Sequence, residues 1–173
     1  GNRLSVPPVH HDPAGGSTEE KEEEAKQVQE KDIIDIYIEC SSTSPEEMDR
    51  QYQYLLECRS HPGNTRSGGD RLTGTYNMIS LTALTQALER IKWPCIVYIH
   101  CRNEWMLNML IHQLPRWVER DFQSSKGKQI AHVGLWKKIA ELVADHELNT
   151  VKGKHAYSTW MKEEMEKGEQ DVR

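Results

Sequence analysis

The chain has 173 residues, which is enough for one domain of ordinary size with an extension. Hydrophobic residues make up 36% and charged residues 28%, and no run approaches the roughly 20 consecutive apolar residues of a membrane-spanning helix. The formal net charge of −5 argues against the strongly basic class of nucleic-acid-binding proteins, which need clustered Lys and Arg. Because the first residues also lack the apolar segment of a signal peptide, we expect a soluble cytoplasmic protein without a membrane partner.

The chain contains four cysteines, Cys40, Cys58, Cys95 and Cys101. They lie in or beside predicted strands, and no two of them form a Cys-x-x-Cys pair. This spacing predicts reduced, mostly buried thiols rather than a disulfide framework.

The first 31 residues differ in composition from the rest of the chain. Residues 1–16 are rich in Pro, Gly and His without an apolar period, which predicts disorder. Residues 17–31 consist mainly of helix formers but lack an apolar stripe, so a helix there would be exposed and marginal. We therefore divide the chain into a disordered or marginally helical charged extension (1–31), a domain (32–168) and a disordered tail (169–173).

Three strands are predicted at the start of the domain. Ile33–Cys40 is a nearly continuous β-branched run, which indicates a central strand covered on both faces. Arg50–Arg59 alternates in polarity, and Thr65–Leu72 follows it after the turn sequence His61-Pro62-Gly63-Asn64. These two stretches predict a hairpin.

The rest of the domain alternates helices and strands. The predicted elements are a helix from about Thr75 to Lys92, a strand from Cys95 to His100, a helix from about Asn103 to Phe122 that Pro115 kinks or divides, a helix from about Val133 to Asp145, a strand from Glu147 to Lys152 and a helix from Tyr157 to Lys167. Helical crossovers make the last two strands parallel to the first. The sequence therefore predicts an α/β fold with a mixed five-stranded sheet, an antiparallel three-stranded meander plus two parallel strands, and helices packed on both faces.

This order of elements resembles ribonuclease H over about residues 32–167. The local stretches that agree are Ile36-Tyr37-Ile38-Glu39 with the family's first strand, Asn77–Ile91 with its first helix, Ile96–Cys101 with its fourth strand, Trp117–Trp136 with its helix, basic loop and Asn-Val-Asp-Leu-Trp passage, and Val151-Lys152-Gly153 followed by His155 with its Val-Lys-Gly-His. The stretch from Gly153 to Met161 is also similar to the ending of small proteins of bacterial conjugative elements. That likeness implies a bacterial mobile genetic element as the context.

The resemblance implies a catalytic site of clustered carboxylates that hold two Mg²⁺ ions about 4 Å apart. Carried over by position, the first acid falls on Glu39, the second on Ser80 and the third on Cys101. A hydroxyl and a thiol do not replace the anionic oxygen ligands that Mg²⁺ prefers. The resemblance therefore implies a degenerate active site, with Glu39 as a weak metal ligand.

The fourth acid of the family belongs on the last helix. Glu163 and Glu164 are the nearest acids there, while Trp160 is the alternative occupant of the position. The family's histidine, which assists proton transfer, falls on His155. The simpler interpretation of His155 is a polar residue beside a glycine turn.

A zinc site is the alternative at the same end of the sheet. Parallel first and fourth strands would bring Glu39, Cys40, His100 and Cys101 together, with His155 nearby, and Cys and His ligands suit Zn²⁺. Against this, His100 and Cys101 point to opposite faces because side chains alternate along a strand. Buried thiols and a partly exposed histidine are the favoured interpretation.

In the family, a basic loop helps to bind the RNA–DNA hybrid, and the corresponding stretch of this chain contains few basic residues. Its candidate nucleic-acid contacts are Arg116, Arg120, Lys126 and Lys128, with Arg102, Lys152 and Lys154 at the end of the sheet. Glu119 and Asp121 interrupt the first group, and such mixed charge is typical of a solvated helix face. We therefore expect weak binding of an RNA–DNA hybrid or DNA.

Three hypotheses follow. The preferred one is a non-catalytic module, with no cofactor, that binds nucleic acid weakly or serves in protein interaction. The second is an active ribonuclease H-type endonuclease with Mg²⁺ or Mn²⁺, in which Glu39, His155 and either Glu163 or Glu164 act. The third is a module with a protein partner and no nucleic acid.

Overall fold

The computed structural model describes residues 30–123, 126 and 128–171, so most of the predicted extension and residues 172–173 of the predicted tail lie outside the described part. The elements along the chain are β1 (Ile33–Cys40), β2 (Met48–Cys58), β3 (Thr65–Gly74), α2 (Tyr76–Glu89), β4 (Ile96–Cys101), α3 (Glu104–Asn108), the π-helix η1 (Met109–Gln113), α4 (Leu114–Glu119), α5 (Val133–Val143), β5 (Glu147–Lys152) and α6 (Ser158–Asp171).

The strands form one five-stranded sheet in the order β3-β2-β1-β4-β5. β1 pairs antiparallel with β2 and parallel with β4, while β3 and β5 extend the sheet at its two sides. This topology confirms the predicted mixed sheet, and the bounds of β1 and β5 are the predicted ones.

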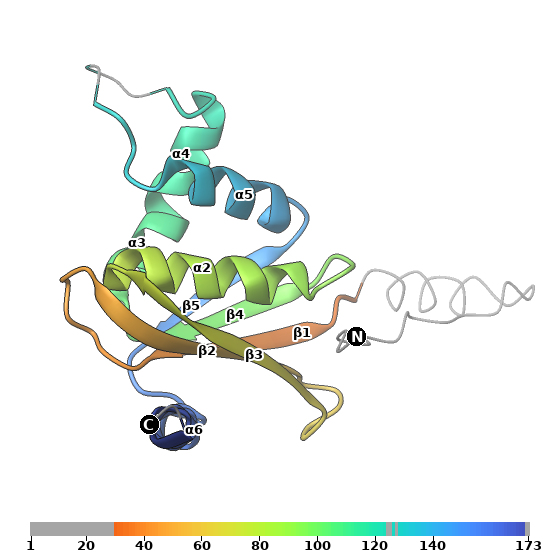
Figure 1. The fold of residues 1–173 in the computed structure, drawn as a ribbon. Coiled ribbons are helices and arrows are strands. Elements are labelled where there is room, and N and C mark those ends of the chain that lie inside the picture. The colour runs from red at the N-terminus through yellow and green to blue at the C-terminus, as the bar shows by residue number, and fades with distance from the viewer. Residues whose placement is uncertain (1–29, 124–125, 127, 172–173) are drawn as a thin grey trace, which may run out of the picture.

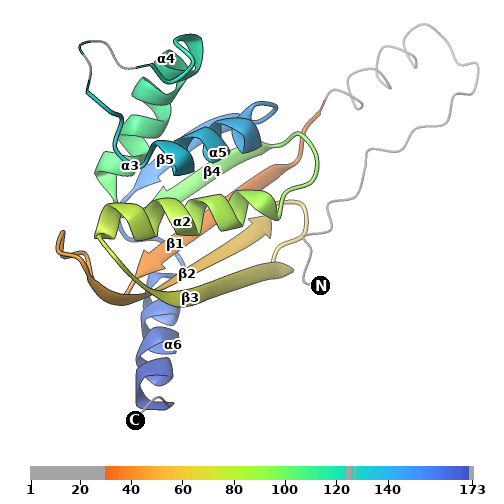
Figure 2. The same ribbon diagram turned by 45° about the horizontal axis from the view of Figure 1, so that its top comes forward.

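Helices cover both faces of the sheet (Figures 1 and 2). α2 and α5 lie on one face and enclose the main hydrophobic core, whereas α6 lies on the opposite face against β1 and β2. β1 is therefore buried on both sides, as predicted. Ile36 and Ile38 face the main core, and Tyr37 and Glu39 face α6.

The predicted helix over 103–122 spans residues 104–119 without a break, but its helical form changes just before Pro115. Proline has no N–H for the hydrogen bond to the carbonyl four residues back, and its ring crowds that carbonyl. The turn before it widens into η1, in which the N–H of Leu114 bonds to the carbonyl of Met109, and Pro115 then lies in the first turn of α4. The predicted division is therefore not seen, and the effect of Pro115 takes the form of this π-helical turn within a continuous helical segment.

The last helix is longer than the sequence pattern indicates. α6 continues to Asp171, so residues 169–171, which were assigned to a disordered tail, are helical. The reason is compositional, because Glu and Gln, which stand at positions 169 and 170, are good helix formers even without an apolar stripe. Within the described residues, no helix is both long and apolar enough to cross a membrane.

The described residues between 104 and 143 form a helical lobe on the α2 side of the sheet (Figure 1). Trp136 of α5 is fully buried there. Its ring lies 6.0 Å from that of Trp105 and 5.5 Å from that of Trp117, measured between ring centroids. Trp136 thus attaches α3, α4 and α5 to one another.

We expect Trp136→Ala to lower the free energy of unfolding by roughly 3–5 kcal/mol, because it removes a large buried side chain and leaves a cavity. Urea unfolding followed by circular dichroism measures this change. Trp160→Ala is the matched control, since Trp160 is 43% exposed and its loss should cost less than about 1 kcal/mol. Equal losses in both variants would contradict this account of the lobe.

Candidate functional site

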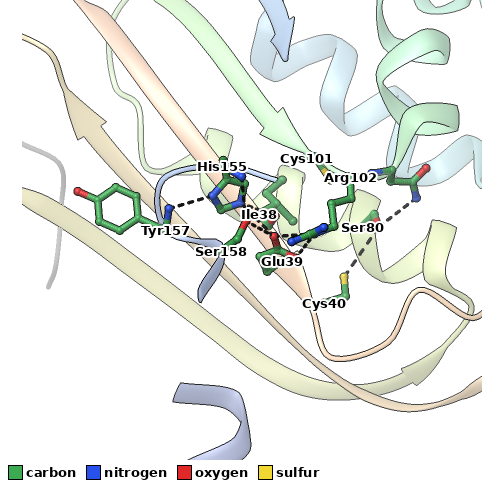
Figure 3. Close-up of polar contacts among 10 residues, drawn as sticks. Ile38, Glu39, Cys40, Ser80, Cys101, Arg102, His155, Tyr157 and Ser158 are labelled. Carbon is green, nitrogen blue, oxygen red and sulfur yellow. Dashed lines mark hydrogen bonds and ion pairs between the residues drawn. The ribbon is translucent and has the colours of Figure 1, made fainter. Parts of the chain in front are cut away.

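The candidate site lies where the carboxyl ends of β1 and β4 meet. These two strands are parallel neighbours, so Glu39 and Cys101, which end them, lie at the same end of the sheet. Ser80 of α2 reaches the site from the main core, and Ser158, the first residue of α6, reaches it from the opposite face (Figure 3). All four side chains are buried.

Glu39 is the centre of this site, and its carboxylate is fully engaged. The hydroxyl of Ser158 donates to Oε1 over 2.5 Å, and Nε of Arg102 lies 3.0 Å from Oε1 and 3.2 Å from Oε2. Nε2 of His155 lies 3.5 Å from Oε1. Glu39 is 3% exposed, so solvent does not compensate its charge. The guanidinium of Arg102 does so inside the protein.

His155 is held in a neutral form by its own hydrogen bonds. Nε2 donates to the carbonyl of Ile38 over 3.0 Å, and Nδ1 accepts from the backbone N–H of Tyr157 over 3.2 Å. A second ring proton would collide with the Tyr157 N–H. Burial lowers the pKa of His155, despite the nearby carbonyl of Ile38 and the carboxylate of Glu39. The ring therefore fastens the loop between β5 and α6 to β1.

Neutral side chains occupy the two positions on which the resemblance places the second and third acids. Ser80 donates to the carbonyl of Tyr76 over 2.7 Å and accepts from Nδ2 of Asn103 over 3.1 Å. Burial raises the pKa of Cys101 to about 12 and that of Cys40 to about 11, so both thiols are protonated. The second and third positions therefore bring no negative charge to the site.

Asn103 joins these neutral groups together. Its side chain also donates to Oδ1 of Asn77 over 3.0 Å, and its own Oδ1 caps α3 by accepting from the N–H of Met106. The backbone N–H of Asn103 points to the sulfur of Cys101, 3.4 Å away. Sequence reasoning took Asn103 only as the start of a helix. The signal that it missed was an Asn at an N-cap two residues after Cys101.

On α6, the residue that contacts Glu39 is Ser158, which sequence reasoning also missed. Glu163 is exposed, Glu164 pairs with Lys167 over 3.2 Å, and Trp160 is 43% exposed. The structure therefore does not bring either predicted glutamate to Glu39. The available signal was the shortness of the loop after His155, which places the first turn of α6, rather than its second, against β1.

The donor set does not fit a two-Mg²⁺ site, because it contains one carboxylate, two hydroxyls and a protonated thiol. Among the described residues, no group of three or more His, Cys, Asp or Glu side chains is arranged to hold a metal ion. The strand register also separates the zinc candidates. Cys40 and Cys101 lie on the α2 side of the sheet, and Glu39 and His100 lie on the α6 side.

A second charged cluster lies next to the site on the α6 face. Asp35 of β1 accepts two hydrogen bonds from Arg59, over 2.9 and 3.1 Å, and one contact from Nε2 of His100 over 2.8 Å. Burial alone would raise the pKa of Asp35, but the bonds from Arg59 and His100 hold it below its usual value. His100 thus contacts Asp35 and not the site residues. The residues around His100 in the sequence give no sign of this partner, which lies 65 positions away along the chain.

The predicted basic residues fall in two places. Arg116, Arg120, Lys126 and Lys128 are exposed in the helical lobe. At the end of the sheet, Lys154 is exposed and Lys152 pairs with Glu104 over 3.2 Å. Arg102 differs from all of these because it contacts Glu39.

Comparison with known proteins relates this geometry to one family. No protein-family model matches the chain. It is 37% identical over 95 residues to ribonuclease H of Gluconobacter oxydans (55% of this chain and 62% of that protein). It is 31% identical over 94 residues to ribonuclease H of Bordetella pertussis (54% of this chain and 59% of that protein). The match therefore spans less than two thirds of the length of these curated relatives.

Solved structures have the same fold at low sequence identity. LC9-RNase H1, a type 1 RNase H with the type 2 active-site motif, superposes with a TM-score of 0.62 at 15% identity, over 82% of this chain and 74% of that chain. RNase H1 of the halophilic archaeon Halobacterium salinarum superposes with a TM-score of 0.56 at 13% identity, over 80% of this chain and 98% of that chain. The foamy viral protease–reverse transcriptase in complex with RNA/DNA hybrid superposes with a TM-score of 0.54 at 15% identity, over 79% of this chain and 20% of that chain. The chain is thus similar to ribonuclease H over about half of its sequence, and it shares the fold of these solved structures.

We expect His155 to make the stability of the protein fall in mild acid. Its pKa is lower in the folded than in the unfolded chain, so its contribution is complete above the unfolded value of about 6.5 and is lost as the pH falls below it. His155→Gln should cost roughly 1 kcal/mol at neutral pH and should flatten the decline in unfolding free energy between about pH 7 and 5.5. His112→Gln, at an exposed position of η1, is the control and should keep the wild-type slope. An unchanged slope in His155→Gln would show that the ring is not held neutral.

Proposed function

We propose that this chain is a ribonuclease H-like module that binds a nucleic-acid duplex, an RNA–DNA hybrid or DNA, without cleaving it. The observation that carries the proposal is the contact of Arg102 with both carboxylate oxygens of Glu39, 3.0 and 3.2 Å away. The guanidinium of Arg102 therefore already contacts the carboxylate oxygens that a metal ion would have to bind.

The absence of cleavage follows from the charge balance of the site. Hydrolysis with two metal ions needs several carboxylates to bring both ions together. A Mg²⁺ ion that took Glu39 would have to displace Arg102 and Ser158, and it would find no second carboxylate at Ser80 or Cys101. Breaking a buried ion pair typically costs roughly 3–5 kcal/mol, less where one partner is partly exposed.

Binding to a duplex is supported by the charge of the helical lobe. Residues 116–138 of the lobe contain six basic and two acidic side chains, and the rest of the lobe adds Glu104 and Glu141, so the lobe carries a formal net charge of +2 although the whole chain carries −5. These side chains are exposed: Arg116, Arg120, Lys126, Lys128, Lys137 and Lys138, with Glu119 and Asp121. Few phosphate contacts of this kind give weak, salt-dependent affinity. The foamy viral relative in fold, which is in complex with RNA/DNA hybrid, supports a duplex as the ligand.

The competing function is metal-dependent cleavage of RNA in RNA–DNA hybrids, with Mg²⁺ or Mn²⁺. The similar proteins of Gluconobacter oxydans and Bordetella pertussis are both named ribonuclease H, which favours this function. The geometry disfavours it, since Glu163 and Glu164 lie away from Glu39 and both ring nitrogens of His155 are occupied. A protein partner is the third possibility, and no contact in the described residues favours it over a duplex.

We expect purified protein to bind a fluorescently labelled RNA–DNA hybrid with micromolar affinity that falls with salt, and to leave the hybrid intact in Mg²⁺ or Mn²⁺. Arg116→Glu combined with Arg120→Glu should weaken binding roughly tenfold, because two cations of the lobe are reversed. Lys167→Glu, on the exposed side of α6, is the matched control and should bind as the wild type does.

Two results would contradict this function. Metal-dependent cleavage that Glu39→Gln abolishes would show an enzyme. A lack of binding to hybrid and to double-stranded DNA at low salt would remove nucleic acid as the ligand.

A further inference from the structure

Arg102 uses only one edge of its guanidinium inside the protein. Nε makes both contacts to Glu39, and among the described residues Nη1 and Nη2 have no hydrogen-bond partner. The side chain is 33% exposed, so this second edge is accessible at the end of the sheet. A guanidinium has five N–H donors in a planar fork, and four of them are on Nη1 and Nη2.

The surroundings of Arg102 on β4, α3 and the β5–α6 loop favour an anion. Lys154 is exposed in that loop, which the hydrogen bond from the Gly153 N–H to the Cys101 carbonyl (3.1 Å) places beside the end of β4. The nearest exposed acid on these elements is Glu104, and Lys152 pairs with it over 3.2 Å. His155 is neutral. These elements therefore present two cations, Arg102 and Lys154, without an exposed acid left unpaired.

The charge of Glu39 does not prevent an anion from binding next to it. Glu39 is compensated by Nε of Arg102 and by the hydroxyl of Ser158, and it lies at the amino-terminal, electropositive end of the 14-residue helix α6. A guanidinium can contact a carboxylate on one edge and a phosphate on another, because its donors lie in one plane and point in different directions.

We propose that Nη1 and Nη2 of Arg102 donate hydrogen bonds to the two non-bridging oxygens of one phosphodiester group. The guanidinium then binds the phosphate in place of a metal ion. The proposal rests on the proposed function, since it names the group of the duplex that this end of the sheet receives. Binding at this position needs no divalent metal. Arg102 thus has two roles, as counter-ion of Glu39 and as phosphate ligand.

The alternative is that Arg102 acts only as the counter-ion of Glu39. Two variants separate these roles. Arg102→Lys keeps a positive charge beside Glu39 but loses the fork. Arg102→Gln combined with Glu39→Gln replaces the ion pair by two neutral amides, so that no buried charge is left without a partner. Urea unfolding of each variant confirms that it is folded before binding is measured.

The test is fluorescence anisotropy with a labelled RNA–DNA hybrid in EDTA. We expect Arg102→Lys and the double Gln variant to bind roughly five- to tenfold more weakly than the wild type, and the double Gln variant to lower the slope of log affinity against log salt by about one. Lys167→Gln, exposed on α6, is the control and should change neither quantity. Equal binding by wild type and both Arg102 variants would overturn this inference while leaving the proposed function intact.

Loss of binding in the wild type itself would instead refute the proposed function. Inorganic phosphate tests the source of the ligand. We expect it to shift the Nε–H resonance of Arg102 only at millimolar concentration, whereas the hybrid shifts it at micromolar concentration. If inorganic phosphate bound as tightly as the hybrid, free phosphate rather than a phosphodiester of nucleic acid would be the ligand, and the inference would fail.

Discussion

The structure around this site depends on compensating one buried carboxylate. Glu39 is 3% exposed, and an isolated ionised carboxylate at such a place would be very unfavourable. Arg102 from the β4–α3 connection and Ser158 from α6 both bond to it, and His155 lies against it from the β5–α6 loop. A single charged group therefore determines how the ends of two strands and the start of the last helix are joined. The neutral network of Ser80 and Asn103 needs no ion to complete it.

If the proposed function holds, this compensation explains how the fold persists without metal-dependent cleavage. The sheet order and the helices on both faces are those of the superposed structures, at identities of 13–15%. In this chain the positive charge at the end of β1 is the guanidinium of Arg102. A guanidinium carries its charge permanently and needs no ligand set. The remaining positions can then be occupied by hydroxyl, amide and thiol groups, each of which the protein satisfies internally or keeps neutral by burial.

Sequence reasoning recovered the parts of the fold that local patterns determine. The β-branched run of β1 and the spacing of apolar residues in the helices led to the correct sheet order. At the candidate site, Glu39, Ser80 and Cys101 could be named from the sequence because each lies in a strand or helix with its own local match, and their roles stay predictions. Ser158 was not, since its contact with Glu39 spans 119 residues and depends on the length of one loop. Arg102 was taken as a surface cation, because no pattern in the sequence shows that a neighbouring strand ends in a buried acid beside it.

The most direct test is the effect of Mg²⁺ on the stability of the wild-type protein. Urea unfolding is measured with about 10 mM Mg²⁺ and with NaCl of equal ionic strength, since a ligand that binds only the folded state raises stability by mass action. If Arg102 is the counter-ion of Glu39, the two unfolding midpoints should be the same. A higher midpoint in Mg²⁺, lost in Glu39→Gln, would contradict the account and would mean that Glu39 is a metal ligand.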